Sequence, residues 1–277
     1  MPVEFLNDEQ AAAFGRFTGE PSRAELERFF FLEDAGRALT DKCRGDHNRL
    51  GFALQLGTVR CLGTLLPDPL DLPWPVVEYL AAQLGVADVS VVKRYAERLP
   101  TQHEHAREIR QAYGYRDLSD PDATAGLREF IEGRAWTHAE GPYRLFGQAV
   151  GWLRRNRVLL PGVSVLARLV ATVHDGAAER MYRSLAAAAA DADPGLPSRL
   201  QGLLQVPDGQ RVSELERLRR APRRTSSRAM TIALDRVSEV LALGARAAHV
   251  DTVPANRLAV LARYGLTAKG SGAAGAR

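Results

Sequence analysis

The densest group of charged side chains in this sequence is basic, and the chemistry it suggests is phosphate binding. Seven arginines and two acids lie from Arg211 to Arg228, in and around the run ELERLRRAPRRTSSRAM. Such a density of one charge is unfavourable through self-repulsion unless a polyanion relieves it. We therefore predict nucleic-acid contact from the arginines that flank Pro222, namely Arg217, Arg219, Arg220, Arg223 and Arg224.

A second group has the spacing of a helix-turn-helix, in EYLAAQLGVADVSVVKRYAER at 78–98. Ala81 lets two helices approach, Gly85 takes the left-handed turn, and Val86 and Val91 fill the core between the helices. The second helix then runs from 89 to 98. Its exposed side can reach bases and phosphates in a major groove through Ser90, Lys93, Arg94 and Arg98. The alternative is a plain helical hairpin, and Arg94 stands where such motifs often have an apolar residue.

Two smaller groups lie at predicted helix ends. Arg154, Arg155 and Arg157 precede the Pro161–Gly162 turn, where they either complement the helix dipole without a partner or bind phosphates. At a helix N-terminus, backbone N–H groups help to hold a phosphate. The second small group is predicted to lie at such a helix N-terminus and consists of Arg44, His47, Asn48 and Arg49.

The motif around that N-terminus, GDHNRLGFALQLG, also has a purely structural interpretation. Asp46 would cap the helix, and its leucines and Phe52 would form core. Gly51 and Gly57 would be points of close packing. We keep the structural and the phosphate-binding interpretations side by side.

Enzymatic chemistry finds no support in the sequence. His103 and His105 diverge by about 200° on a helix, so we expect both on the surface. Cys43 and Cys61 lack partners at metal spacing, and neither GxxxxGK[ST] nor GxSxG occurs. We expect no catalytic residue, no metal, no cofactor and no small-molecule substrate.

Helix signals position these groups along nearly the whole chain. Ser22 with Glu25, and Thr101 with Glu104, have the spacing of capping boxes. Pro73 precedes a predicted helix that ends at Gly85. Alternating strand patterns are nearly absent, so we predict an all-α fold, a multi-helical array with helix-turn-helix-like units.

Charge and composition suggest how the chain is organised. Residues 1–150 carry 17 basic and 23 acidic side chains, and residues 151–277 carry 20 and 10. We predict an N-terminal helical domain at 1–165, a second basic DNA-binding region at 166–266, and a disordered tail at 267–277. No apolar run long enough for a membrane span and no signal peptide is evident, so we expect a cytoplasmic protein.

The string GDHNRLGFALQLGTVRCLG resembles the N-terminal region of replicative transposases of the Tn-three family. The similarity extends from about Val3 to Leu266 and includes QLGVADVSVVKRYAER, WLRRNRVLLPGVSVLARLV and HVDTVPANRLAVLARYG. In that family this helical region recognises terminal inverted repeats. The three metal-binding acids lie in an RNase-H-like domain much further along, so the resemblance assigns no catalytic residue here.

The resemblance thus implies that the chain binds double-stranded DNA at terminal inverted repeats and lacks the catalytic domain. Two alternatives stay open. One is a degenerate transposase remnant that folds without useful binding. The other is a helical module that inhibits intact transposase through mixed complexes, which makes full-length transposase a second candidate partner.

Overall fold

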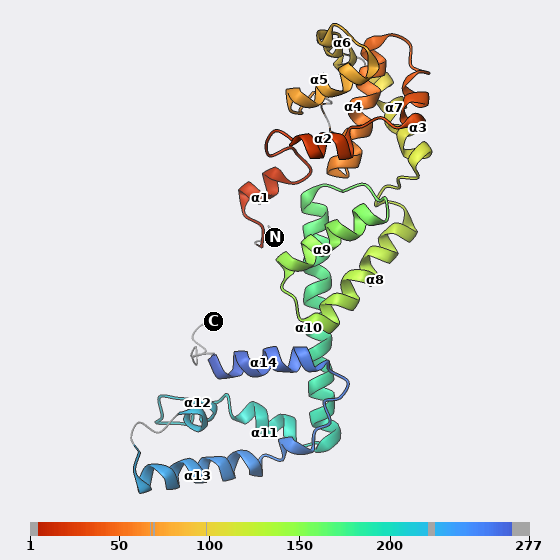
Figure 1. Ribbon diagram of the computed structural model, residues 1–277. Coiled ribbons are helices and arrows are strands. Elements are labelled where there is room, and N and C mark those ends of the chain that lie inside the picture. Colours follow the sequence, from red (N-terminus) through yellow and green to blue (C-terminus); the bar gives the residue numbers. More distant parts are fainter. Residues whose placement is uncertain (1–4, 67, 69, 98, 221–224, 268–277) are drawn as a thin grey trace. The chain divides into compact units, whose positions relative to one another are not determined.

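The computed structural model describes residues 5–66, 68, 70–97, 99–220 and 225–267. Within them the chain forms fourteen α-helices, two short 3₁₀ helices and no strand (Figure 1), which confirms the predicted all-α fold. Its one β-type pairing there is an isolated bridge between Arg116 and Val158. Of the tail predicted at 267–277, Thr267 is the last residue of a helix, and residues 268–277 lie outside the described part.

Contacts divide the chain into two units. Unit 1 comprises 1–133 and 140–174, and unit 2 comprises 134–139 and 175–277. Helices α8 (Pro121–His138) and α10 (Val163–Ala192) contribute residues to both. The other α-helices of unit 1 are α1 (Asp8–Ala13), α2 (Arg23–Phe29), α3 (Asp34–Thr40), α4 (Asp46–Leu62), α5 (Trp74–Leu84), α6 (Val92–Ala96), α7 (Leu99–Tyr113) and α9 (Pro142–Arg155). Those of unit 2 are α11 (Leu196–Gly202), α12 (Glu214–Arg219), α13 (Ser227–Ala242) and α14 (Ala255–Thr267). Of the two 3₁₀ helices, η1 (Val89–Val91) lies in unit 1 and η2 (Ala245–Ala247) in unit 2.

Local capping chemistry sets several helix ends as predicted. Ser22 and Glu25 form the expected capping box at the start of α2. Helix α5 follows Pro73 and ends at Gly85, whose φ of +67° is left-handed.

Two predicted caps are wrong. The N-cap of α4 is Gly45, with φ +82°, and Asp46 is the first helical residue instead of the cap. Helix α7 begins at Leu99, so Thr101 already lies inside it. Pro100 explains this start, because proline suits the first turn of a helix, where its missing N–H is not needed.

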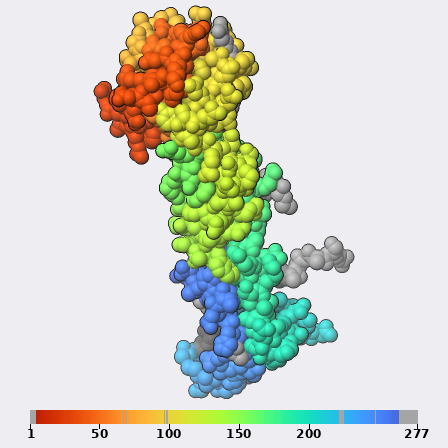
Figure 2. Space-filling view, turned by 90° about the vertical axis from the view of Figure 1, so that its right-hand side faces the viewer, coloured from red at the N-terminus to blue at the C-terminus, as the bar shows by residue number. Residues whose placement is uncertain are grey.

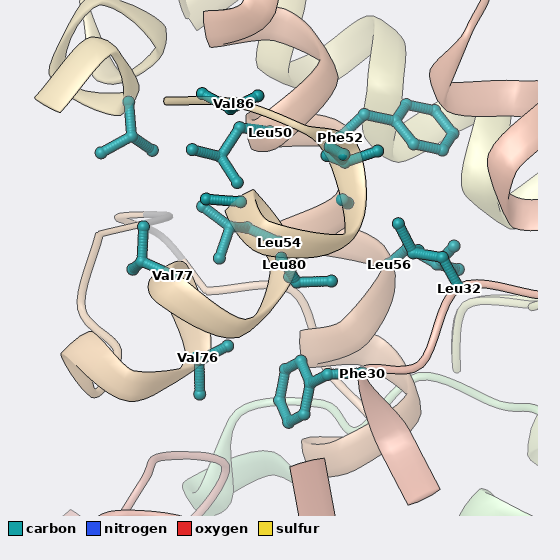
Figure 3. Packing of buried hydrophobic residues seen from close by; sticks show 14 of the residues in the cluster. Phe30, Leu32, Leu50, Phe52, Leu54, Leu56, Val76, Val77, Leu80 and Val86 are labelled. Carbon is teal, nitrogen blue, oxygen red and sulfur yellow. The ribbon is translucent and has the colours of Figure 1, made fainter. Parts of the chain in front are cut away.

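Helix α4 is the centre of unit 1. Every residue from Leu50 to Val59 is buried, and α2, α3, α5, α6 and α7 all pack against the helix. Figure 3 shows the largest part of this core, in which side chains of α4 and α5 share one cluster with Phe30 and Leu32. Because α4 is enclosed on all sides, each neighbour takes its position from it.

Two glycines let aromatic rings reach the backbone of α4. A Cβ atom at Gly51 would lie 2.3 Å from Cγ of Tyr95, and one at Gly57 would lie 2.3 Å from Cδ1 of Phe30. No real side chain tolerates such distances. The predicted close packing at both glycines is therefore confirmed, and any larger residue there must displace a ring.

A buried arginine organises unit 2. Arg257 of α14 is only 6% exposed, and its Nε donates to the carbonyl oxygens of Ala135 (3.0 Å) and Trp136 (3.1 Å). These carbonyls belong to the last turn of α8, where a cation is favoured by the helix dipole. The Arg180 guanidinium lies 4.5 Å from the centre of the Trp136 ring. Arg257 thus ties α14 to the end of α8.

In the described part of the chain, no single helix has the length and hydropathy to cross a membrane. The pair α5 and Val89–Tyr95 passes that test only when both are counted together, and it bends by 110°.

The close contact at Gly51 leads to a stability prediction. We expect Gly51→Ala to lower the free energy of unfolding by about 1–3 kcal/mol or more, because the methyl group overpacks against Tyr95. Gly147, in the interior of α9, is the matched control, since a methyl group added there would meet no neighbouring atom within 4 Å. Gly147→Ala should raise the free energy of unfolding by about 0.5–1 kcal/mol, because alanine suits a helix interior better than glycine does. Urea denaturation measures both, and equal effects would contradict the account.

Candidate nucleic-acid interface

The α5–α6 segment has the geometry of a helix-turn-helix. The chain turns at Gly85, and the Val89–Tyr95 helix is bent by 110° from α5, within the range of about 90–120° for such motifs. Val86 is buried between the helices as predicted. Val91 is only half-buried, and the second filling position belongs to Val92, which is 2% exposed.

The second helix of this motif is shorter than predicted. A 3₁₀ turn forms first, where the Asp88 carboxylate accepts a hydrogen bond from the Ser90 N–H at 3.0 Å. The α-helix then covers only 92–96. The N–H of Glu97 then bonds to the Tyr95 carbonyl oxygen, and Pro100 has no N–H to give the Ala96 carbonyl oxygen, so no regular α-helix runs past it.

The outer side of this helix carries the predicted polar groups. Ser90, Lys93 and Arg94 are exposed, while Val92 and Tyr95 on the opposite side are buried. The arginine at the position where similar motifs often have an apolar residue therefore points its charge to solvent. Arg98, the fourth predicted residue, lies outside the described residues.

Buried polar contacts anchor α6 in this orientation. Nε2 of Gln55 donates to the Tyr95 hydroxyl (2.7 Å) and to the Gln102 carbonyl oxygen (3.3 Å). Since a carbonyl only accepts, this second contact fixes which way the Gln55 amide faces. The Tyr95 hydroxyl lies 3.1 Å from Nδ1 of His105, to which it can then donate. Helices α4, α6 and α7 are joined by this one chain of hydrogen bonds.

His105 corrects the expectation that both histidines are on the surface. It is 8% exposed, whereas His103 is exposed as expected. Accepting from Tyr95 at Nδ1 places the ring proton on Nε2, which lies 3.7 Å from Sγ of Cys43. Gln102, His105 and Ile109 have the spacing of one helical face, which could have indicated that this face of α7 is buried. Two of the three residues are polar, so the pattern was not recognised as a buried face.

Burial keeps this network neutral. It lowers the pKa of His105, raises that of the Cys43 thiol to about 11, and raises that of Tyr95. A proton on Nδ1 of His105 would also leave the Tyr95 hydroxyl without an acceptor for its hydrogen, since Gln55 already donates to it. The uncharged imidazole is therefore the form that fits.

The first turn of α4 lies close to this anchor. Arg49 is paired with Asp41 (3.2 Å) and Asp46 (3.4 Å), which offsets its charge. Nδ2 of Asn48 donates to the Arg44 carbonyl oxygen at 2.9 Å. The Arg44 side chain is exposed and His47 is half-buried. Of this predicted group, Arg44 offers the most accessible charge.

The group at the end of α9 is partly occupied with backbone contacts. Nη2 of Arg154 donates to the carbonyl oxygen of Leu62, the last residue of α4, at 2.9 Å. Nη1 of Arg157 donates to the Tyr113 carbonyl oxygen at 3.0 Å, and its backbone is left-handed with φ +53°. Arg155 is exposed and has no ion pair within the described residues. All three guanidinium groups keep their charge at the surface.

The fold adds arginines that the sequence analysis missed. Arg116 donates its backbone N–H to the Arg157 carbonyl oxygen at 2.9 Å, which brings the end of α7 beside the end of α9. Arg110 pairs there with Asp117 at 2.6 Å, and Arg60 lies 5.2 Å from the centre of the Tyr113 ring. Because these residues are far apart in sequence, no local pattern could have revealed their proximity.

The basic run in unit 2 has less excess positive charge than its sequence suggested, because some of its arginines pair with carboxylates. Arg217 pairs with Glu214 at 2.7 Å and also with Glu239, which lies 22 residues further on, in α13. These two carboxylates raise the pKa of Arg217. Arg219 and Arg220 are exposed, and Glu216 lies 3.9 Å from Arg220. Arg223 and Arg224 are outside the described residues.

A family comparison covers the whole of this α4–α6–α9 region. Residues 5–173 match the family described as "Domain of unknown function (DUF4158)", which is more than half of the chain. The chain belongs to the DUF4158 family. No group of three or more His, Cys, Asp or Glu side chains that could hold a metal ion occurs among the residues described.

The chain is also similar to transposases, over a longer stretch than the family domain covers. The Escherichia coli (strain K12) "Transposase for transposon gamma-delta" is 38% identical over 269 residues, covering 95% of this chain and 26% of that protein. The Pseudomonas aeruginosa "Transposase for transposon Tn501" is 33% identical over 244 residues, 88% of this chain and 24% of that protein. The resemblance to transposases of the Tn-three family is confirmed. The chain spans about a quarter of the length of these relatives.

A shorter match is stronger in identity. The Streptomyces fradiae "Transposase for transposon Tn4556" is 52% identical over 66 residues, which is 24% of this chain and 7% of that protein.

The buried imidazole leads to a pH prediction. Below the ordinary histidine pKa of about 6.5 the unfolded chain takes up a proton that folded His105 does not. Stability is therefore full above that pH, and below about pH 6.5 it should fall by up to about 1.4 kcal/mol per pH unit, until folded His105 also takes up a proton. Denaturation of wild type and His105→Asn across this range measures the difference.

The exposed neighbour serves as the control for that experiment. His103→Asn should leave the pH dependence unchanged, whereas His105→Asn should flatten it. If wild type and His105→Asn lose stability in parallel as the pH falls, protonation of His105 does not cause the pH dependence.

Proposed function

We propose that this chain binds duplex DNA at terminal inverted repeats, with α6 in the major groove. The observation that carries the proposal is the two-sided character of α6. Val92 and Tyr95 hold one side in the core of unit 1, and Lys93 and Arg94 stand on the other, preceded by the exposed Ser90 of η1. Lys and Arg side chains on such a helix can donate to O6 and N7 of guanine. The transposase relatives support the choice of DNA as partner.

The remaining basic groups fit the role of phosphate contacts. Such contacts fix register and orientation without reading sequence. In unit 1 we assign them to Arg44, Arg49, Arg154, Arg155 and Arg157, with His47 and Asn48 as hydrogen-bonding neighbours. In unit 2 we assign them to Arg217, Arg219 and Arg220. Among these, the two carboxylates on Arg217 make it the weakest candidate.

We propose recognition, and not strand cleavage, as the contribution of this chain. Metal-dependent cleavage needs carboxylates that hold ions against the attacking and leaving oxygens. The carboxylates of the α4–α6 region instead serve the fold, as Asp88 does in turning the chain into α6 and Asp46 does beside Arg49. The resemblance puts the acids that bind metal in a different domain.

The first prediction from this proposal concerns salt. If the basic groups engage about 6–10 phosphates, affinity for duplex DNA should fall about 10³–10⁵-fold between 50 and 200 mM salt. Fluorescence anisotropy with a labelled repeat measures this slope. A flat profile, or no binding at low salt, would overturn the proposal.

The second prediction separates base reading from charge. Lys93→Ala with Arg94→Ala should reduce the preference for the repeat over random DNA by about 1–3 kcal/mol per lost base contact. Arg44→Ala with Arg155→Ala removes the same charge and should weaken both DNAs alike. If both double variants lose affinity equally for the two DNAs, α6 belongs to a plain helical hairpin.

A further inference from the structure

A groove of about 460 Å³ lies in unit 2 between α12, α13 and η2. Its floor is apolar and includes Leu218, Val237, Val240 and Leu241. Arginines border it, namely Arg220, Arg236 and Arg246. Nothing in the proposed DNA contacts uses its apolar floor.

The floor is unusually open for aliphatic side chains. Val237 is 54% exposed, Val240 47% and Leu241 46%, and no residue of α13 is buried. Figure 2 shows the light-blue atoms of this helix at the surface. Grouped exposed aliphatic side chains of this kind mark surfaces that bind another protein. The spacing of Ala233, Val237 and Val240 follows one helical face, which suits an elongated occupant.

The arginines at the border have spare charge. Arg236 and Arg246 have no carboxylate partner within the described residues. Nη1 of Arg236 donates to the Arg220 carbonyl oxygen, and its Nε is buried without an acceptor. The nearest carboxylate to Arg220 is 3.9 Å away. Arg217, which lies outside the groove, shows the contrast, since two carboxylates hold it.

We propose that this groove binds an acidic amphipathic helix of a partner protein. Apolar side chains at i, i+3, i+4 and i+7 of that helix would lie on the aliphatic floor, and Asp or Glu on its flanks would pair with the arginines. The α13 residues that line the groove, from Ala233 to Leu241, span about 12 Å, which matches the distance of about 10.5 Å from i to i+7 on a bound helix. The apolar floor is separate from the proposed DNA contacts, which share only Arg220 with the groove.

Charge complementarity selects this occupant over two others. A second copy of the groove would bring its own Arg220, Arg236 and Arg246 against these, which repels. Duplex DNA could satisfy the arginines, but its phosphate backbone offers no apolar surface to the valines and leucines of the floor. An acidic amphipathic helix satisfies both parts of the groove at once.

The test uses a designed 18-residue helical peptide with Leu at the four spacings above and Glu on both flanks. Fluorescence anisotropy with the full chain should show saturable binding. The same peptide with Lys in place of Glu should bind about tenfold more weakly, since it meets arginines. Arg246→Glu should reverse this order in part, weakening the Glu peptide and strengthening the Lys peptide.

A matched pair of variants locates the site. Leu241→Glu should weaken binding of the Glu peptide about tenfold, because it places a carboxylate in the floor. Leu234→Glu changes the same residue type on the same helix, 60% exposed but outside the groove, and should leave binding unchanged. Circular dichroism checks that both variants stay helical.

Three results would overturn the proposal. The first is equal binding of the Glu and Lys peptides to the wild-type chain, without reversal by Arg246→Glu. The second is an equal effect of Leu241→Glu and Leu234→Glu in folded protein. The third is self-association in sedimentation velocity that Leu241→Glu abolishes, which would assign the groove to a second copy. Since Arg246 is an exposed residue, its charge reversal keeps the test decisive even if Leu241→Glu fails to fold.

Discussion

The contact between the Tyr95 ring and the backbone of α4 at Gly51 is the constraint on which unit 1 depends. A Cβ atom at that position would lie 2.3 Å from the ring, so only glycine permits the approach. Gly57 admits Phe30 in the same way, six residues further along. Enclosed by five helices, α4 fixes the place of each, and through Tyr95 it fixes α6. The exposed charges of Lys93 and Arg94 are positioned by this packing.

Hydrogen bonds add direction to the packing. Gln55 donates to Tyr95, whose hydroxyl lies within reach of His105, and the chain is consistent only with an uncharged imidazole. Buried hydrogen bonds whose donors meet acceptors in one arrangement favour that arrangement over others, although Oε1 of Gln55 is buried without a partner among the described residues. A helix of five residues has little stability of its own, because a helix that short is below the length needed for cooperative formation. We infer that α6 keeps its shape through its anchored side, which leaves its other side free for binding.

The sequence predicted what local patterns determine. The all-α fold, the capping box of Ser22 with Glu25, and the ends of α5 at Pro73 and Gly85 follow from residue preferences over a few positions. Packing at Gly51 and Gly57 was predictable because a glycine within an apolar helical pattern needs a reason. The length of α6 was mispredicted, since the effect of Pro100 on the preceding helix was not weighed.

What the sequence concealed is non-local. His105 is buried by helices that lie far away along the chain, and the partner of Arg217 is 22 residues distant, in α13. Arg116 meets Arg157 only because the ends of α7 and α9 are bridged. Charge counts along a sequence cannot register such pairings, so they overestimated the free charge near Arg217. Exposure and geometry select the residues that we propose to contact DNA, and a measurement at the level of single bases tests them.

That measurement is methylation interference on a terminal inverted repeat, compared between wild type and Lys93→Ala with Arg94→Ala. Methylation at N7 of guanine blocks the major groove, and methylation at N3 of adenine blocks the minor groove. With α6 in the major groove, a few guanine N7 positions should interfere with binding of the wild-type chain. The double variant should lose that interference at those guanines and keep its residual binding. An interference pattern that the double variant leaves unchanged, or one confined to adenine N3, would contradict the account.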